Sequence, residues 1–425
     1  METITLAPSV RIPLPGPPLR REHQPVLVRL GAVVSALSHA LDLSTGQFPG
    51  HSVRSCILGM RIGEEIGLSE QTRSDLFYAL LLKDCGYSGN TWAMDSKRFR
   101  AERGASLVRL MGLSDRTART ILHADEHWDD PRQAAGLRKT EIPVMSQIVL
   151  LAQTLEMCLT TAGEHAATDS IDQLSGRWFD PDLVRATTSL AARGSLWADL
   201  RNPQATEVAL RLEPRRKMMT QDDGALDSIC VAFAQIVDAK SPFTFNHSSG
   251  VANAAMAIGR TLDLPWERVL FLRHAALLHD LGKLGVPNAV LEKPGKLDDA
   301  EWETMRLHPS HTWRILKAIP GFDEMSEVAA SHHEKLNGTG YFRGIPGALL
   351  SLEARILAVA DVFDALSAKR PYRDGLPPEL VLQIMRKDAP HALDETCLEA
   401  LEQSGAESDQ TFIDLQNLNR KLNSY

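Results

Sequence analysis

Histidine and aspartate side chains gather in the second half of the chain. Eight of the 14 histidines lie after residue 222, and several stand beside acids, as in His279-Asp280 and His332-His333-Glu334. Asp361 lies in an apolar helical stretch, where an unpaired carboxylate is costly unless a cation or hydrogen-bond donors compensate it. Imidazoles and carboxylates without thiolates suit iron, manganese or zinc, and such sites can hold two ions. The residue types therefore point to metal chemistry.

These residues belong to five segments that follow one another in order. The segments are His247, His279-Asp280-x-x-Lys283, His308-Pro309, His332-His333-Glu334-x-x-x-Gly338-x-Gly340-Tyr341, and Asp361-x-x-Asp364-Ala365-Leu366-x-x-x-Arg370-Pro371-Tyr372-Arg373. A single His-Asp pair arises often by chance, but the whole ordered set resembles the HD-GYP branch of the HD phosphohydrolases.

The resemblance implies a metal-dependent phosphodiesterase that hydrolyses cyclic di-GMP to pGpG, and in some members to GMP, through a metal-activated water. It implies two divalent ions, of which iron or manganese is expected and zinc, nickel or magnesium are alternatives. The positions that match metal ligands are His247, His279, Asp280, His308, His332, His333 and Asp361. Asp280 matches the bridge between the ions, and Lys283 the lysine near the scissile phosphate. Arg370 and Arg373 match basic residues that face the substrate phosphates, where guanidinium groups offer paired donors.

Three positions depart from the family pattern. The Gly-Tyr-Pro sequence of the family is replaced by Gly340-Tyr341-Phe342, and Asn337 stands where an aspartate is usual. Neither position matches a ligand, so we expect these changes to affect the loop and its contacts more than catalysis. Family members with a third ion carry a glutamate at the position of Phe243, and this difference also favours two ions.

Each of these assignments has a purely structural alternative. The ligand set could be a buried hydrogen-bonded network without metal, and Arg370 and Arg373 could form a solvated basic turn. Glu334 is expected to orient the histidine ligands rather than to bind metal. Asp364, three residues after Asp361, is expected either to support the ligands or to make a helix contact.

The chain contains an internal repeat. The segment that starts at His51 aligns with the segment that starts at His247, an offset of 196 residues. Further on the offset becomes 208, as between Glu126 and Glu334, so the second copy has about 12 extra residues around Pro287–Asp299. Both copies space apolar residues three and four apart, which is typical of helices. We expect an all-α protein of two tandem HD-type helical bundle domains, the second with the metal site.

The first copy does not keep the ligand set. Its seven equivalent positions are His51, Lys83, Asp84, Arg100, Ala124, Asp125 and Gln153. Lys83 and Arg100 would place fixed positive charges where a cation should bind, so we expect no metal in this copy. The first copy is then a scaffold or a regulatory lobe, through which a signalling protein or a second copy of the chain could bind.

The predicted organisation has five parts. They are a Pro-rich arm at 1–24, a degenerate HD-type domain at 25–205, a linker at 206–221, the HD-GYP domain at 222–405 and a C-terminal helix or tail at 406–425. The polar stretch 213–224 suits an exposed linker.

The net charge, the apolar stretches and the cysteines exclude several classes of partner and location. The 425 residues carry a net charge of −8, which argues against DNA or RNA polymers as partners. No long uninterrupted apolar stretch or signal sequence indicates a membrane protein, and the five scattered cysteines indicate no disulfide framework, so we expect a cytoplasmic protein. The leading hypothesis is a cyclic di-GMP phosphodiesterase. The alternatives are a catalytically weak cyclic-dinucleotide sensor and a phosphohydrolase for another cyclic dinucleotide.

Overall fold

The computed structural model describes residues 27–87, 97–130, 136–220, 224–241, 246–367 and 375–405. These residues form helices with one short antiparallel ribbon, in which β1 (Val28–Arg29) pairs with β2 (Met218–Met219). The prediction of an all-α protein is confirmed. The predicted arm at 1–24 and tail at 406–425 lie outside the described residues.

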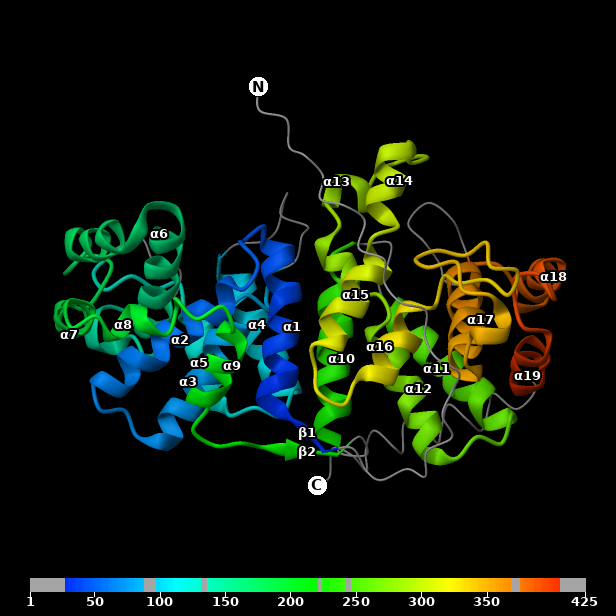
Figure 1. Ribbon diagram of the computed structural model, residues 1–425, viewed down its shortest axis with the longest axis horizontal. Helices are drawn as coiled ribbons and strands as arrows, with labels where there is room; N and C mark the ends of the chain where they lie inside the picture. The colour runs from blue at the N-terminus through cyan, green and yellow to red at the C-terminus, as the bar shows by residue number, and fades with distance from the viewer. Residues whose placement is uncertain are drawn as a thin grey trace.

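The helices form two bundles that lie side by side (Figure 1). The N-terminal half, residues 27–220, contains α1 (Leu30–Thr45), α2 (His51–Glu65), α3 (Glu70–Leu82), α4 (Lys97–Leu110), α5 (Asp115–Leu122), η1 (Lys139–Glu141), α6 (Val144–Gln173), α7 (Pro181–Ala192), α8 (Ser195–Ala198) and α9 (Ala205–Leu212). The C-terminal half, residues 224–405, contains α10 (Gly224–Asp238), α11 (His247–Thr261), α12 (Trp266–Leu278), η2 (Leu281–Gly285), α13 (Asn288–Leu291), α14 (Asp299–Met305), α15 (His308–Lys317), α16 (Asp323–Ala330), η3 (Gly347–Leu349), α17 (Leu352–Ser367), α18 (Pro378–Asp388) and α19 (Glu395–Gly405).

The helices of the two halves correspond in order and in bounds. Helices α2 and α3 have the bounds of α11 and α12 shifted by 196 residues, and α5 has those of α16 shifted by 208. Helix α13 lies where the sequence predicts extra residues in the second copy, and α14 begins at the end of that stretch. Both helices project beyond the bundle (Figure 1). These matches support the duplication, while the domain boundaries themselves stay predictions.

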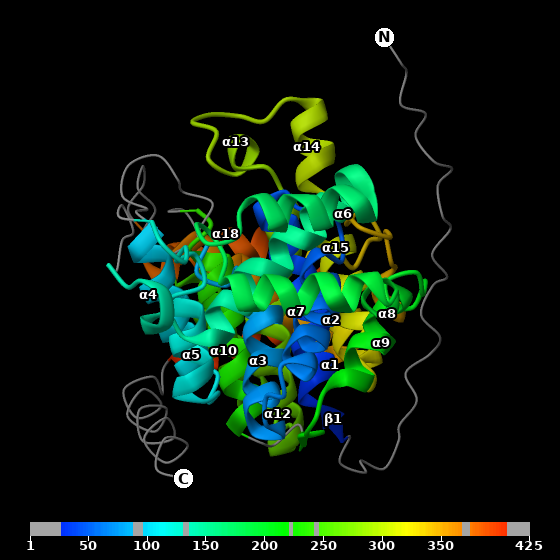
Figure 2. The same ribbon diagram turned by 90° about the vertical axis from the view of Figure 1, so that its left-hand side faces the viewer.

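The two halves pack through their first helices. Helix α1 contacts η2 and α15 of the other half, and α10 contacts α4. Buried apolar side chains of both halves form one continuous core. The view along the long axis shows the C-terminal half directly behind the N-terminal one (Figure 2). The elements that carry the predicted metal ligands therefore have a neighbour from the first copy.

The connection between the halves is exposed in part only. Residues 205–212 form α9, which packs on α2. Glu213 is 4% exposed, accepts a hydrogen bond from the Tyr78 hydroxyl at 2.6 Å and pairs with Arg29. Residues 215–218 are exposed, as the sequence suggests, but Glu213 is buried because Tyr78 and Arg29 compensate its charge.

Helix α6 is the longest helix of the described residues and is long and apolar enough to cross a membrane by length and composition alone. Over half of its most apolar window is buried inside the protein. The backbone of Gly163 has φ 87° and kinks the helix. Helix α6 packs on α2, α3, α5 and α7, as a core helix does.

Candidate metal centre

Five helices bring the predicted ligands together, and four of them supply a ligand at or near an end. His247 and His308 are the first residues of α11 and α15. His279 directly follows α12, and His332 lies two residues beyond α16. Asp361 lies within α17. Helix ends have backbone groups without intrahelical partners, so side chains there can be fixed by nearby carbonyls.

Three of the histidines are held in this way. In each, ring atom Nδ1 lies at hydrogen-bond distance from the carbonyl oxygen three residues earlier. The pairs are His279 with Ala276 at 2.6 Å, His308 with Met305 at 2.7 Å and His332 with Ala329 at 2.7 Å. A carbonyl oxygen can only accept, so Nδ1 carries the hydrogen and Nε2 presents a lone pair. A metal ligand needs this tautomer.

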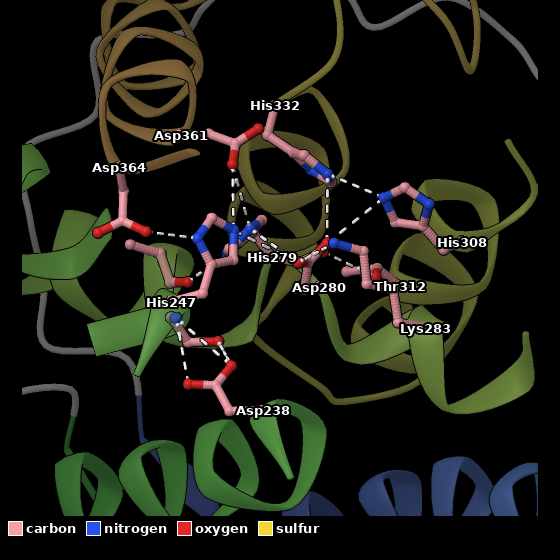
Figure 3. Close-up of polar contacts among 12 residues, drawn as sticks. Asp238, His247, His279, Asp280, Lys283, His308, Thr312, His332, Asp361 and Asp364 are labelled. Atoms are coloured by element: carbon pink, nitrogen blue, oxygen red, sulfur yellow. Dashed lines mark hydrogen bonds and ion pairs between the residues drawn. The ribbon is translucent and has the colours of Figure 1, made fainter. Parts of the chain in front are cut away.

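Asp280 is 1% exposed and lies between two pairs of histidines, His247 with His279 and His308 with His332 (Figure 3). Its Oδ2 is 3.3 Å from Nε2 of His279 and 3.7 Å from Nε2 of His247. Its Oδ1 is 3.4 Å from Nε2 of His308 and 3.7 Å from Nε2 of His332. Each oxygen thus faces one pair of ring nitrogens, which is the arrangement of a carboxylate between two ion sites.

The ligand atoms form two groups that could each hold an ion. One group is His247, His279 and Asp280, and the other is His308, His332 and His333; within each group the ligand atoms lie within 4.8 Å of one another. Asp361 extends the first group, because its Oδ1 is 3.2 Å from Nε2 of His247. Its Oδ2 is 3.8 Å from Nδ1 of His333.

The facing imidazoles need positive charge between them. Nε2 of His308 lies 3.1 Å from Nε2 of His332. Burial lowers the pKa of His308 to about 3 and the pKa of His332 to about 4, so neither ring takes up a second proton near neutral pH. Two lone pairs at this distance repel each other, and a cation that binds both removes the conflict. The donor set therefore fits a divalent metal.

Carboxylates surround His247 on the other side of the cluster. Its Nδ1 is 2.6 Å from Oδ2 of Asp364. Burial opposes protonation of His247, but its bonds to Asp361 and Asp364 and the charge of Asp280 outweigh burial and raise its pKa to about 10. Burial also opposes ionisation of Asp361, but its bond to His247 and the nearby histidines outweigh burial and hold its pKa well below the usual range. This side of the cluster attracts positive charge.

The turn that carries the His-Asp pair is held by α15. The hydroxyl of Thr312 donates to the carbonyl of His279 at 2.9 Å and accepts from the backbone N–H of Gly282 at 2.8 Å. Lys283, in η2, contacts Asp280 through its Nζ. Lys283 therefore reaches the edge of the cluster, as a lysine near the scissile phosphate must, although that role stays a prediction.

Comparisons with known proteins agree with this geometry. The HD domain family matches residues 232–397. The chain is 36% identical to 3'3'-cGAMP-specific phosphodiesterase 3 of Vibrio cholerae over 88% of this chain and 94% of that protein. It is 30% identical to 3'3'-cGAMP-specific phosphodiesterase 1 of the same organism over 82% of this chain and 83% of that protein. The cyclic di-GMP phosphodiesterase response regulator RpfG of Xanthomonas campestris is 36% identical, over 38% of this chain and 43% of that protein.

A solved structure gives the same result in three dimensions. The crystal structure of a cyclic GMP-AMP specific phosphodiesterase in V. cholerae superposes with a TM-score of 0.67 at 34% identity, covering 89% of this chain and 98% of that chain. The chain belongs to the HD-GYP family. Its HD-GYP motifs lie in the C-terminal half, on the elements that carry the cluster.

One prediction is wrong for the loop that contains Gly340 and Tyr341. Glu334 does not orient the histidines. Its carboxylate accepts hydrogen bonds from the backbone N–H groups of Arg343 at 2.8 Å and Ile345 at 2.9 Å, so it anchors this loop. The Tyr341 ring stacks on His333 with centroids 4.6 Å apart. The guanidinium carbon of Arg343 lies 4.7 Å from the centroid of the Phe342 ring. The residue that replaces the family proline therefore packs against Arg343.

The equivalent positions of the N-terminal half hold ion pairs between protein side chains. His51 pairs with Glu156, and Arg54 donates to Glu156 at 2.6 Å. Lys83, which occupies the position of His279, contacts Asp84. Lys83 and Arg100 occupy the positions of His279 and His308, whereas Arg54 occupies the position of Gly250. The absence of metal from this half stays a prediction.

Two groups of predicted residues cannot be placed. Arg370, Arg373 and Phe243 lie outside the described residues, so the substrate-binding role of the arginines and the argument against a third ion stay predictions from the sequence. Sequence reasoning also missed functional contacts. Thr312 and the anchoring role of Glu334 depend on contacts between segments distant in sequence, and their only signal was proximity to matched ligands.

Proposed function

We propose that this chain is a metal-dependent phosphodiesterase that hydrolyses a cyclic dinucleotide with two divalent ions. The proposed ligands are the seven matched residues, His247, His279, Asp280, His308, His332, His333 and Asp361, with Asp280 as the bridge. The observation that carries the proposal is the position of Asp280, whose two oxygens each face two Nε2 atoms at 3.3 to 3.7 Å. Iron and manganese are the first candidates, because the set lacks thiolates.

The residues around the cluster suit attack on a phosphodiester. When bound, the ions would lower the pKa of a water molecule and stabilise negative charge on the phosphate. Lys283 supplies a further positive charge beside Asp280 for the developing phosphate charge. Burial, together with the charges of Asp361 and Asp280, raises the pKa of Tyr341, so its hydroxyl stays protonated and can donate to the substrate. Addition of water to phosphorus and cleavage of one P–O bond gives the linear dinucleotide.

For the substrate, 3'3'-cGAMP is the first candidate and cyclic di-GMP the second. Two relatives that match over more than four-fifths of this chain are named 3'3'-cGAMP-specific phosphodiesterases. RpfG, which is named for cyclic di-GMP, matches over 38% of it. Both substrates share two 3',5' phosphodiester bonds, and the metal ligands do not distinguish between their bases. This assignment replaces cyclic di-GMP as the leading candidate.

The first test is product analysis. Protein purified without oxygen and loaded with iron(II) or manganese(II) is incubated with 3'3'-cGAMP or with cyclic di-GMP, and the products are separated by chromatography. The wild-type protein should form a linear dinucleotide. Asp280→Asn should lower the rate by more than the roughly 100-fold upper range for groups that only support ligands, because it changes the bridge itself. Metal content should fall in parallel.

His51→Gln is the matched control, since His51 is the repeat-related residue of the N-terminal half. It should leave the rate and the metal content unchanged. Undiminished activity in Asp280→Asn would refute the proposed mechanism. Binding of cyclic dinucleotide without hydrolysis in the metal-loaded wild type would favour the sensor hypothesis instead.

A further inference from the structure

Helix α14, which follows the extra residues of the C-terminal half, is joined to the candidate metal centre. Helix α14 ends at Met305, and the carbonyl oxygen of Met305 holds Nδ1 of His308 at 2.7 Å. At the start of this helix, Glu301 accepts from the backbone N–H of Asp298 at 2.8 Å and pairs with Lys293. These bonds tie the start of α14 to the preceding loop. Helix α14 is therefore an ordered wall beside a predicted ligand.

A line of rings and a guanidinium leads outward from the cluster along this wall. Tyr341 stacks on His333 with an angle of 29° between the rings. The Arg306 guanidinium carbon is 5.7 Å from the centroid of the Tyr341 ring and 5.9 Å from that of Trp302. Arg306 thus lies between an aromatic ring at the cluster and one on α14, in the range of cation–π contacts.

The outer end of this line is open to solvent and carries positive charge. The Arg306 side chain is 51% exposed, and Trp302 is 44% exposed. The acid beside Arg306 is Glu303, at 3.3 Å and 75% exposed, and an ion pair this exposed holds a guanidinium weakly. Arg306 can therefore exchange Glu303 for an anionic ligand, while Trp302 offers a ring on which a base can stack.

We propose that Arg306 and Trp302 form a substrate subsite, in which Arg306 binds the phosphodiester that is not being cleaved and Trp302 stacks on a nucleobase. This inference rests on the proposed function. A cyclic dinucleotide has a second phosphate and two bases that the metal centre does not contact. The subsite supplies one donor fork and one aromatic face on the side of the centre from which α14 projects.

The test separates this subsite from the metal centre with two substrates. Bis(4-nitrophenyl) phosphate is a small diester that has neither a second phosphate nor a base. For Arg306→Met and Trp302→Ala, we expect KM for the cyclic dinucleotide to rise about tenfold or more, since loss of base stacking alone costs roughly 1–3 kcal/mol. Hydrolysis of bis(4-nitrophenyl) phosphate and metal content should stay at the wild-type level. Arg306→Lys and Trp302→Phe should recover part of the affinity.

Arg98→Met is the matched control, because Arg98 is the repeat-related arginine and pairs with Glu102 at 2.8 Å on the surface of the N-terminal half. It should change neither KM for the cyclic dinucleotide nor hydrolysis of bis(4-nitrophenyl) phosphate. An unchanged KM in Arg306→Met, or an equal loss with both diesters, would overturn the subsite. Equilibrium binding of cyclic dinucleotide to chelator-treated protein distinguishes the two proposals. Binding that is lost in Arg306→Met without any hydrolysis by metal-loaded wild type would keep the subsite and reject the enzyme. The absence of both binding by chelator-treated wild type and hydrolysis by metal-loaded wild type would reject both proposals.

Discussion

At the residue scale, the two halves share a pair of a histidine and a carboxylate but differ in the residue beside it. His247 and Asp364 in one half correspond to His51 and Glu156 in the other. A Cβ on Gly250 would lie 1.8 Å from Oδ1 of Asp364, so only glycine lets this carboxylate approach α11. The N-terminal half has Arg54 at that position, and its guanidinium neutralises Glu156. Both halves thus pair a carboxylate with this histidine, and the N-terminal half adds an arginine to the pair.

The charge around His247 predicts that metal binding releases protons. Its pKa is raised to about 10, so His247 carries its proton at pH 8, and an ion at Nε2 must displace that proton. We expect roughly one proton or more to be released per chain. Calorimetric titration with manganese(II) at pH 8 in two buffers of different ionisation enthalpy measures the number.

Variants of Asp364 separate its charge from its hydrogen bond. Asp364→Asn keeps an acceptor for Nδ1 but removes a charge that raises the pKa of His247, so fewer protons should be released. Asp364→Ala removes both and should weaken metal binding by about 10–100-fold. Glu156→Ala, the repeat-related change, should leave proton release and affinity as they are. Equal effects of Asp364→Ala and Glu156→Ala would show that Asp364 does not act through His247.

At the element scale, a glycine sets the distance between the His-Asp turn and α15. A Cβ on Gly282 would lie 1.9 Å from the backbone oxygen of His308. Gly86 has the same place in the N-terminal half, where a Cβ would lie 2.1 Å from the backbone oxygen of Arg100. The close approach is therefore a feature of the helix arrangement in both halves, but only in the C-terminal half does it lie beside the proposed ligands.

Replacing each glycine with alanine tests whether the close approach affects folding in both halves but metal binding in only one. Gly282→Ala and Gly86→Ala should each lower the free energy of unfolding by about 1–3 kcal/mol, the usual range for overpacking. Only Gly282→Ala should also reduce metal content, because it moves His308 relative to Asp280. Denaturant unfolding and metal analysis of both variants give the comparison. Loss of metal in Gly86→Ala alone, or in neither variant, would contradict it.

The sequence could predict the elements better than their contacts. Motif spacing identified the residues that gather in the cluster, and apolar periodicity identified the helices, because both are local properties of the chain. The roles of Glu334 and Arg306 could not be predicted. Glu334 acts on backbone groups nine and eleven residues away in a loop, and Arg306 depends on Tyr341, which follows another helix. The burial of Glu213 likewise depends on Tyr78, which is 135 residues away.

At the scale of the whole molecule, the N-terminal half supports the element that carries Lys283. A Cβ on Gly285 of η2 would lie 3.4 Å from Leu43 of α1. On the other side of the interface, Arg103 of α4 donates to the carbonyl of Gln235 in α10 at 3.3 Å. Since α1 also contacts α15, both η2 and the helix that begins with His308 pack against the first copy. The continuous core predicts that the halves unfold together.

Metal should therefore stabilise both halves, although only one is proposed to bind it. At a free metal concentration of 100 Kd, the gain is about 2.7 kcal/mol. If unfolding is one cooperative event, hydrogen exchange should slow by the same factor in the most protected amides of α2 and α11. Leu43→Asp places a charge against η2 and should confine the effect to α11, whereas Phe48→Asp, at a position that is 57% exposed, should not. Protection limited to α11 in the wild-type protein would mean that the two halves unfold independently, and the first copy would then be a neighbour of the metal centre rather than part of its support.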